Sequence, residues 1–492
     1  MILRRAPDKP REECGVFGIF NHPDAAVLTT LGLHALQHRG QEACGIVTFD
    51  DGHFYAERHL GLVGDSFTGE DLPKRLPGRV AIGHNRYSTQ GRPALRNIQP
   101  IFADLADGGV AIAHNGNITN ARAKRQELVS GGAIFQSTMD TEVILQLLAK
   151  SPRTRSTDRL ADALMQVDGG YAVVAITRTK LIGARDPIGL RPLILGKLDN
   201  AWVLASESCA LDIIGAEFVR EIDNGEIVEI TAEGIRSIRP FPERPAAPCV
   251  FEFVYFARPD SIVHGRSVYE VRRRMGLKLA EEHQIDADVV IPVPDSGVPA
   301  AIGYAEASGL PFQLGIIRNH YVGRTFIEPT QKLRVSKIAK KHSPNRGQIA
   351  GRRVVLIDDS VVRGNTSREI VKMVRQAGAK EVHFLSASPP ITHPDFYGID
   401  MPSREELMAY RHGVNGAGPG PHIAAMAREL KADSLGYLSV EGLYDAIGLG
   451  PRNPDIPQFS DHCFTGDYPT RLVDRDEDKA DKDRQLTLML ER

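Results

Sequence analysis

The segment of residues 353–379, RVVLIDDSVVRGNTSREIVKMVRQAGA, constrains the fold of this chain more than any other stretch. It begins with an unbroken aliphatic run at residues 354–357, which is typical of a strand buried on both faces of a parallel sheet. Two carboxylates, Asp358 and Asp359, end that run. The pattern therefore predicts a doubly wound α/β domain with acids at the carboxyl end of a central strand.

A polar loop and the start of a helix follow the predicted strand. Thr366 and Ser367 can cap this helix, which carries Ile370 and Val374 on its apolar face and stops at Gly378. Backbone donors at such a helix start suit a phosphate. The adjacent acids can hold sugar hydroxyls and Mg²⁺, so one loop could grip both ends of a phosphorylated ribose. An ordinary strand, turn and helix without a ligand remains the alternative.

The stretch VVLIDDSVVRGNTS closely resembles the 5-phosphoribosyl-1-pyrophosphate (PRPP) motif of the type I phosphoribosyltransferases. The resemblance implies that PRPP is bound by Asp358, Asp359, Ser360, Arg363, Gly364, Asn365, Thr366 and Ser367. Asn365 stands where a second threonine or similar residue is common, a change that backbone amides should tolerate because they carry much of the phosphate binding. The motif alone does not name the acceptor that displaces pyrophosphate.

A second buried strand is expected at residues 288–294, DVVIPVP, followed by a turn and an alanine-rich helix. Its turn should lie at the same sheet edge as Asp358. The family resemblance implies that this turn meets the pyrophosphate and that Ser296 joins the Mg²⁺ shell. Between the two units, residues 318–341 are basic and polar. They are either a solvated charged face or, by resemblance, a mobile lid whose Arg324 and Lys332 bind PRPP.

The N-terminal part begins with a predicted strand, CGVFGIF, after a charged leader at residues 1–13. By pattern alone Cys14 could be one more buried strand residue. Three polar, glycine-containing loops are then predicted at residues 83–89, 114–117 and 139–142. They offer a cation, an amide beside a glycine, and a carboxylate. A free amino acid needs a guanidinium and an acid, and an amide under attack needs donors for its oxyanion.

The motifs CGVFGIF, LQHRGQEACGI, GHNRYSTQG, AHNGNITN, DTEVI, DGGYA and RDPIGLRPL resemble the class II glutamine amidotransferase domain, an N-terminal-nucleophile hydrolase with an αββα sandwich. The resemblance implies that residues 1–13 are removed and that the freed α-amino group of Cys14 is the base for its own thiol. It also implies an oxyanion hole at Asn115 and Gly116, with Arg86 on the glutamine carboxylate and Asp140 on its ammonium. Structural ion pairs and a plain Asn-Gly turn are the alternatives.

At 492 residues the chain exceeds what one core usually supports, so two domains are expected. The proline-rich segment RPFPERPAAP at residues 239–248 is the predicted boundary. This gives a glutaminase domain at 14–245, a phosphoribosyltransferase domain at 246–470 and a charged tail at 471–492. Just past the boundary, FEFVYFARPDS is expected to be a strand and residues 267–282 a helix with Val271, Met275 and Leu279 on one stripe.

Charge and cysteine usage narrow the class of protein further. A net charge of −2 gives no general reason to bind nucleic acid or an anionic membrane, and no apolar run is long enough to cross a bilayer. Five cysteines without a CxxC indicate reduced thiols and a cytoplasmic location. Cys44 is expected in the core. His34 and His38 have the i, i+4 spacing of a zinc pair, but a helix lying on the sheet is the favoured interpretation.

Together, and in this order, the two resemblances are those of the amidophosphoribosyltransferases, the first committed enzymes of purine biosynthesis. They imply that glutamine is hydrolysed at Cys14 and that ammonia passes to C1 of PRPP, giving phosphoribosylamine, pyrophosphate and glutamate. Coupling gated by PRPP, feedback by purine nucleotides and a homotetramer are further expectations. A PRPP-binding regulator without turnover and a different glutamine amidotransferase are the rival hypotheses.

One departure from the family concerns an iron-sulfur cluster. Many leader-bearing members hold it on four cysteines, and two matching positions survive here as Cys249 and Cys463. Asp395 and Ser460 stand at the others. Cubane clusters prefer thiolates, and an aspartate and a serine are poor substitutes. The sequence therefore predicts no cluster. The cofactor expected from the acids of the PRPP motif is Mg²⁺.

Overall fold

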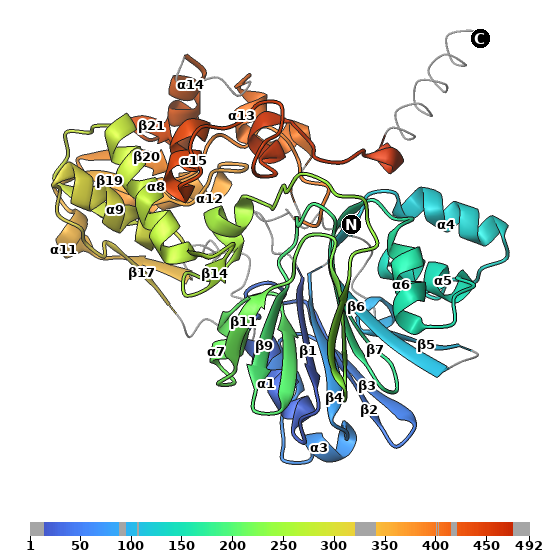
Figure 1. Cartoon of the computed structure of the whole chain (residues 1–492). Helices are drawn as coiled ribbons and strands as arrows, with labels where there is room; N and C mark the ends of the chain where they lie inside the picture. The colour runs from blue at the N-terminus through green and yellow to red at the C-terminus, as the bar shows by residue number, and fades with distance from the viewer. Residues whose placement is uncertain are drawn as a thin grey trace, which may run out of the picture.

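A computed structural model describes residues 14–87, 95–105, 108–319, 341–399, 401, 403–414 and 421–475, which form two lobes joined through an extended interface (Figure 1). The first lobe, blue to green in the figure, holds two stacked antiparallel sheets. The second lobe, yellow to red, is built around a parallel sheet. Among the described residues, no helix is long and apolar enough to cross a membrane.

The first sheet of the N-terminal lobe has seven antiparallel strands. Their order is β11 (Glu217–Glu221), β9 (Ile194–Leu198), β10 (Ala201–Ala205), β1 (Gly15–Phe20), β4 (Val80–Arg86), β2 (Ala43–Asp50) and β3 (His53–Leu60). Helices α1 (Ala25–Ala35) and α7 (Cys209–Asp212) pack on its outer face, where Phe17, Leu33 and Leu211 share one core with Cys44. The prediction that Cys44 is a core residue is confirmed.

The second sheet of this lobe has six antiparallel strands. Their order is β13 (Gly234–Ile238), β12 (Ile227–Thr231), β8 (Leu181–Arg185), β7 (Gly169–Ile176), β6 (Gly108–Ile118) and β5 (Ile101–Leu105). Its outer face is covered by α4 (Ala121–Ser130), α5 (Thr141–Lys150) and α6 (Ser156–Leu164). The inner faces of both sheets meet in a core that includes Val16, Ile82, Ala113 and Val174. These four layers confirm the predicted αββα sandwich.

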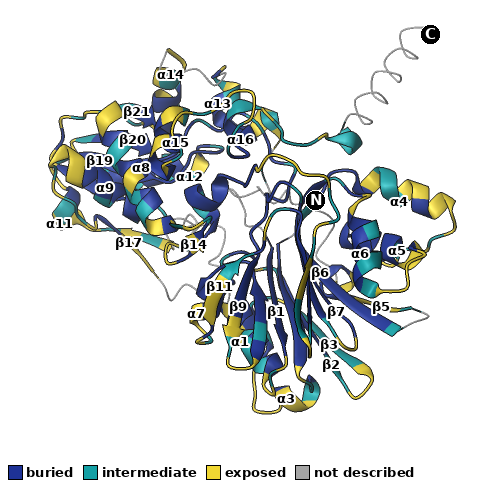
Figure 2. Ribbon diagram, viewed as in Figure 1, coloured by how far each residue is buried: buried dark blue, intermediate teal, exposed yellow. Residues whose placement is uncertain are grey.

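The C-terminal lobe has a parallel four-stranded sheet, in the order β16 (Val289–Pro292), β19 (Arg353–Asp358), β20 (Glu381–Ser386) and β21 (Ser434–Tyr437). On one face lie α8 (Val268–Glu282), α9 (Val298–Ser308) and α15 (Val440–Ile447), and on the other α12 (Asn365–Gln376) and α14 (Pro421–Leu430). Figure 2 shows these strands dark blue between the two helix layers. Burial on both faces explains the unbroken aliphatic run at residues 354–357.

Shorter elements complete the two lobes. They are α2 (Val63–Ser66), α3 (Leu72–Arg75), η1 (Leu95–Asn97), β14 (Ile262–Val263), β15 (Arg266–Ser267), β17 (Ile316–Arg318), β18 (His342–Pro344), α11 (Arg346–Ile349), η4 (Arg404–Glu406), α13 (Met408–Arg411) and α16 (His462–Thr465). The predicted helix at residues 267–282 is confirmed as α8, with Ser267 as its N-cap accepting from the N–H of Glu270. Its stripe of Val271, Met275 and Leu279 is buried.

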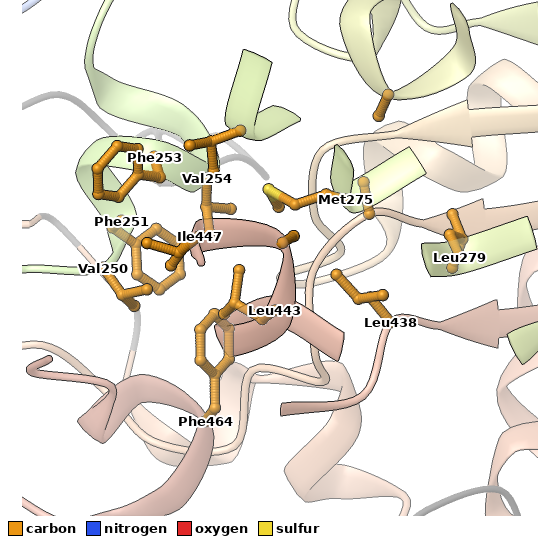
Figure 3. Close-up of a cluster of buried hydrophobic side chains, with 14 of the residues drawn as sticks. Val250, Phe251, Phe253, Val254, Met275, Leu279, Leu438, Leu443, Ile447 and Phe464 are labelled. Carbon is orange, nitrogen blue, oxygen red and sulfur yellow. The ribbon is translucent and has the colours of Figure 1, made fainter. Parts of the chain in front are cut away.

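The segment FEFVYFARPDS does not form the predicted strand. Residues Glu252–Phe256 form η2, a helix with the wide π-type turn. Figure 3 shows Phe251, Phe253 and Val254 packed against side chains of α8 and α15. A short apolar run cannot distinguish a strand from a buried helix, and here nearly every side chain is buried rather than every second one. The prediction was wrong because periodicity gave no evidence either way.

The start of α12 also differs from the expectation. Thr366 and Ser367 lie inside its first turn and do not cap it. The preceding residue, Gly364, takes the N-cap position with φ of 81°, a left-handed conformation that favours glycine. A Cβ on Gly364 would lie 2.5 Å from the sulfur of Met408. The backbone conformation therefore favours glycine here, and a larger residue would also require the side chain of Met408 to shift.

Candidate active sites

Cys14 lies immediately before β1, buried at the centre of the seven-stranded sheet. Its thiol donates to the carbonyl oxygen of Tyr87 over 3.7 Å. Burial raises the pKa of the Cys14 thiol to about 11, although the Tyr87 bond and Arg86 act in the opposite direction. The thiol is therefore protonated at neutral pH, and a nucleophilic role would require a base close to it.

Residues 83–86 of the first predicted polar loop, and all of the second, are strand in the structure. Arg86 is the last residue of β4, and Asn115 and Gly116 lie inside β6. The side chains His84, Asn85 and Arg86 are all buried, so their polarity did not mark a solvent-exposed loop. The polar residues at the end of β4 therefore belong to a buried polar site and not to a surface turn. The third stretch does contain a helix start, at Asp140.

Asn115 has an unusual environment for an amide. Its side chain is fully buried, and neither its oxygen nor its nitrogen has a hydrogen-bond partner in the described part of the chain. Asn115 and Gly116 pair with Ala172 and Tyr171 in the β6–β7 ladder, which excludes the plain Asn-Gly turn. A buried amide without a partner costs about 1–3 kcal/mol, so it is expected to have a ligand in the working protein.

Gly116 is tightly constrained by β7. Its φ is 132°, and a Cβ at this position would lie 2.0 Å from the carbonyl oxygen of Gly170. No side chain fits there without moving the strand. The glycine therefore allows the two backbones to approach one another beside Cys14.

Asp140 is the N-cap of α5. Its carboxylate accepts from the N–H groups of Thr141 and Ile118, each over 3.0 Å, and lies 3.5 Å from Nε2 of His114. Burial alone would raise the pKa of Asp140, but His114 and the two N–H groups outweigh it, so the pKa lies below its ordinary value. Asp140 is therefore an anion. The buried Arg86 provides the opposite charge in the same site.

One small cavity joins four of the five predicted glutaminase residues. Cys14, Arg86, Gly116 and Asp140 line it together with Tyr87, Gln99, His114 and Met139. Its volume is about 10 Å³, roughly the space for one water molecule. Glutamine is much larger, so side chains of the site must move to admit it. The grouping nonetheless brings a thiol, a cation, an anion and a backbone donor to one point.

Sequence reasoning missed a buried ionic group behind Cys14. Arg39 donates to Glu252 over 2.6 and 3.0 Å, pairs with Glu207, and its Nε donates to the carbonyl oxygen of Cys14 over 3.4 Å. Burial would raise the pKa of Glu207, but His38 and Arg39 hold it well below its usual range. Arg39 stands in the motif LQHRGQEACGI, but its two carboxylate partners lie more than 160 residues away in sequence.

The position of Glu207 also bears on whether His34 and His38 form a zinc pair. His38 lies beyond the end of α1 and contacts Glu207 over 2.7 Å, whereas His34 is in the last turn of that helix. The pair therefore does not share one helical face. Helix α1 lies on the sheet, as the favoured interpretation expected.

The predicted PRPP acids lie at the carboxyl end of β19, and both are buried. The hydroxyl of Ser360 donates to Asp359 over 2.7 Å, and the hydroxyl of Ser296 donates to the other oxygen of Asp359. Strands β16 and β19 are parallel neighbours, with Pro292 beside Ile357. The expectation that the turn after residues 288–294 meets the loop after Asp358 is confirmed.

Several side chains of the predicted phosphate loop after Asp359 contact other protein groups. Arg363 is ion-paired with Glu406 over 2.9 Å, and Asn365 accepts from Arg368 over 3.0 Å. The side chain of Ser367 is buried, so it is part of the packing of α12. The predicted ligands Arg324 and Lys332 lie outside the described residues, as do most of the basic segment and the leader.

The buried Arg272 was also not predicted from the sequence. Arg272, on α8, donates to the carbonyl oxygens of Phe253 and Ala257 over 2.7 and 2.9 Å. Burial lowers the pKa of Arg272 to about 10, while Asp359 and Glu207 act to raise it. Its guanidinium thus satisfies carbonyls of the wide helix η2, which helps explain why this segment is not a strand.

The four positions matching the cluster ligands of other members come together in the C-terminal lobe. Ser460 forms an isolated bridge with Cys249, and Cys463 is buried nearby. His462 contacts Asp395 through Nε2 over 2.8 Å and Ser460 through Nδ1 over 2.7 Å. Ligand atoms of Asp395, His462 and Cys463 lie within 4.8 Å of one another, the one such group found among the described residues.

Comparison with known proteins gives two family matches along the chain. Residues 84–212 match a glutamine amidotransferase domain, and residues 260–387 match a phosphoribosyl transferase domain. The amidophosphoribosyltransferase of Rhizobium etli is 58% identical over 473 residues, 95% of this chain and 94% of the relative. The amidophosphoribosyltransferase of Bacillus subtilis is 46% identical over 462 residues, 94% of this chain and 95% of the relative.

Solved structures agree with these matches over nearly the whole chain. The glutamine PRPP amidotransferase of B. subtilis, complexed with ADP and GMP, superposes with a TM-score of 0.86 at 45% identity, covering 93% of this chain and 98% of that one. A structure described as the allosteric regulatory enzyme of purine biosynthesis gives a TM-score of 0.87, also at 45% identity, covering 93% and 97%.

Proposed function

The chain belongs to the amidophosphoribosyltransferases, the glutamine PRPP amidotransferases of purine biosynthesis, and from this premise we propose how its own residues carry out the two half-reactions. The observation that carries the proposal is the grouping of Cys14, Arg86, Gly116 and Asp140 around one cavity, in a chain that also carries buried Asp358 and Asp359. The rival hypotheses lose support, because the relatives from R. etli and B. subtilis, which match over nearly their full length, are both amidophosphoribosyltransferases.

In the glutaminase half-reaction, Sγ of Cys14 attacks the side-chain carbonyl carbon of glutamine. Arg86 and Asp140 bind the α-carboxylate and the α-ammonium, because they are the buried cation and anion of the cavity. The oxyanion that forms is stabilised by the N–H of Gly116 and by Nδ2 of Asn115, the buried donor without a partner. Collapse of this intermediate releases ammonia, and water then hydrolyses the thioester to glutamate.

The base for Cys14 is proposed to be its own α-amino group after removal of residues 1–13. A thiol with a pKa near 11 needs help to ionise, and an α-amine titrates near pH 8. The amine must be neutral to accept the proton. Glutaminase activity is therefore expected to fall as the pH drops below about 8.

In the second half-reaction, ammonia attacks C1 of PRPP and displaces pyrophosphate. Asp358 and Asp359 are proposed to hold the ribose hydroxyls, and the start of α12 the 5-phosphate, through Arg363, Gly364, Asn365, Thr366 and Ser367. Arg324 and Lys332 are proposed to reach PRPP from the basic segment. Ammonia must cross from one lobe to the other unprotonated, since ammonium is no nucleophile.

Oxygen ligands for Mg²⁺ fit the PRPP site. Ser296, Asp358 and Asp359 offer a hydroxyl and two carboxylates where two loops meet, and hard oxygen donors are what this ion prefers. When bound with PRPP, Mg²⁺ would neutralise charge on the leaving pyrophosphate. The protein itself buries the two carboxylates and holds them in position.

The residues present do not fit the iron-sulfur cluster of other members. Two of the four positions are a carboxylate and a hydroxyl, and His462 contacts both of them. We propose that this chain holds no cluster there. Purified protein should show substoichiometric iron and acid-labile sulfide and no visible absorption of a cluster. Stoichiometric iron with sulfide would contradict the proposal, and stoichiometric zinc would assign the group to a single ion.

Several wider features are proposed on the family premise. The glutaminase domain is proposed at 14–245, the phosphoribosyltransferase domain at 246–470 and a charged tail after them. The two domain matches fall inside these limits. Regulation by purine nucleotides is supported by the relative solved with ADP and GMP. A homotetramer and a cytoplasmic location stay predictions.

The proposed function is tested by measuring glutamate release from glutamine with Mg²⁺, with and without PRPP, on protein whose N-terminus is checked by intact mass. Release that PRPP stimulates, together with phosphoribosylamine formation, is the expected result. No release from protein that begins at Cys14 would overturn the proposal.

Asn115→Ala is expected to lower kcat of glutamine hydrolysis about 10²–10³-fold, because it removes one oxyanion donor. The KM for glutamine should change little, since the amide acts on charge that develops in the transition state. Synthesis from PRPP and added ammonia is the control and should persist. An unchanged kcat would exclude Asn115 from the oxyanion hole.

A further inference from the structure

A short segment of the C-terminal lobe, residues 394–399, lies against the glutaminase site, and we call it the strap. The side chain of Asn117 donates to the carbonyl oxygen of Phe396 over 2.8 Å. Arg191 donates from two nitrogens to the carbonyl oxygen of Tyr397, over 3.1 and 2.5 Å. Both donors belong to the N-terminal lobe. Two consecutive carbonyl groups of the strap are thus fixed to that lobe.

The strap also touches the proposed oxyanion hole. A Cβ on Gly398 would lie 3.1 Å from the carbonyl carbon of Gly116 and 3.2 Å from its Cα. Gly398 has φ of 123°, so both space and backbone favour glycine. The strap therefore packs directly on the backbone whose N–H is proposed to stabilise the oxyanion. A displacement of Gly398 would change the position of Gly116 or release it.

Within its own lobe the strap is shaped by a buried polar clip, which consists of Asp395, His462 and Ser460. One oxygen of Asp395 accepts from the N–H groups of Tyr397 and Ile399, over 2.8 and 2.7 Å. The other contacts His462 over 2.8 Å, and His462 reaches Ser460 over 2.7 Å. All three side chains are buried. The clip thus fixes the backbone turn that places Gly398.

Strand β20 and residues 387–393 connect the strap to the PRPP acids. Strand β20 pairs with β19 up to Asp358, and the N–H of Ala387, just past β20, donates to the carbonyl oxygen of Asp358 over 2.9 Å. The N–H groups of Thr392 and His393 both donate to the carbonyl oxygen of Cys463, beside the clip. Hydrogen bonds thus fix both ends of residues 387–393, the segment between β20 and the strap.

The strap also borders open space. A cavity of about 430 Å³ lies between the lobes, and Pro394, Asp395 and Phe396 line it together with Asn117 and Arg404. Coupling between two sites requires an element that can take two positions. The strap contacts Gly116 and also lines this cavity, so there is adjacent space into which it can shift.

On the basis of the proposed function, we propose that the strap is the element through which the PRPP site sets the geometry of the oxyanion hole. The clip fixes the distance between the strap and Gly116. PRPP binding changes this distance through β19 and β20. Asp395, His462 and Ser460 are then positioning residues, which act through Gly398 and touch no substrate. Asp395 and Ser460, at positions where other members bind a cluster, thus hold the strap in place in this chain through hydrogen bonds without a metal.

The test uses the full chain and compares glutamate release with and without PRPP in two variants, Asp395→Asn and Asn117→Ala. The first disturbs the clip and the second removes one bond between strap and glutaminase lobe. Each is expected to lower the stimulation by PRPP at least about fivefold, the lower end of typical couplings between sites. The loss should appear in kcat rather than in the KM for glutamine. Synthesis from PRPP and added ammonia should stay within about twofold of the parent in Asp395→Asn, because the acids of β19 are untouched.

Asp433→Asn is the matched control. Asp433 is also a carboxylate that accepts a backbone N–H, that of Val382 over 2.7 Å, but it lies at the opposite end of β20. It should leave the stimulation unchanged. A merely structural strap would lower the melting temperature of the variants while the stimulation stayed as in the parent, and that result would overturn the proposal.

Outcomes for the parent protein separate the two proposals. Without glutamate release from the parent, the proposed function itself fails. With release that PRPP stimulates, and the same stimulation in both variants, only the strap proposal fails. If Asp395→Asn does not fold, Asn117→Ala decides the question alone, because it removes one side-chain amide and no buried charge.

Discussion

Cys14→Ala is expected to abolish glutamine hydrolysis, with a fall of at least about 10³-fold, because no other side chain of the cavity can form the thioester. Synthesis of phosphoribosylamine from PRPP and added ammonia should continue, since Asp358 and Asp359 lie in the other lobe. Glutamate release and pyrophosphate release, measured on the same preparation, separate the two half-reactions. The variant thereby becomes an ammonia-dependent enzyme.

Cys44→Ala is a matched control for that experiment. Cys44 is also a buried thiol of the same sheet, and its pKa is likewise raised to about 11 by burial, but it does not line the cavity. It should lower stability modestly and keep glutamine hydrolysis. Equal loss in both cysteine variants would indicate a packing defect, and full activity of Cys14→Ala would remove Cys14 from the mechanism.

Asp358→Asn and Asp359→Asn are expected to lower phosphoribosylamine synthesis about 10³-fold with either source of nitrogen. Each change removes a buried negative charge that the proposed Mg²⁺ and ribose contacts require, an effect of several kcal/mol. The stimulation of glutaminase by PRPP should disappear with it, while the unstimulated rate persists. Pyrophosphate release and PRPP binding by calorimetry measure the two effects.

The control for the acids is Asp288→Asn. Asp288 lies just before β16 at the amino end of the sheet, where it pairs with Arg353 over 2.8 Å. This pair is partly exposed, so its loss should cost little stability and leave synthesis intact. Synthesis that survives in Asp358→Asn and Asp359→Asn would show that PRPP is held elsewhere.

The parallel sheet and the sandwich could be predicted from sequence because their signals are local. The run at residues 354–357 required burial on both faces, and the structure has it between two helix layers. The meeting of Ser296 with Asp359 followed from one topological rule, that parallel strands end at one edge. Both inferences needed only neighbouring residues and the geometry of the sheet.

The features that could not be predicted from the sequence depend on contacts between residues distant in the chain. Nothing around Arg39 indicates that Glu252 lies against it, and nothing in Asp395 indicates His462. The helix η2 was missed because its carbonyl partners come from Arg272 on the following helix. Wide helical turns need such outside support, and apolar patterning does not record it. Arg86, at the end of β4, and Asn115, inside β6, were assigned to loops for a related reason, because the sequence around a polar residue does not show that distant parts of the chain bury it.

The buried group of Arg39, Glu207 and Glu252 has a practical consequence for anyone who wishes to divide this protein. A cut near residue 245 would separate Arg39 from Glu252 and remove the N–H of Arg258 and the hydroxyl of Ser261, which both donate to Glu207. A buried charge that loses its partner typically costs 3–5 kcal/mol. The excised glutaminase lobe would therefore not reproduce the same lobe in the whole chain. A foreign partner joined to the glutaminase lobe would have to supply two hydrogen-bond donors and a carboxylate at this interface.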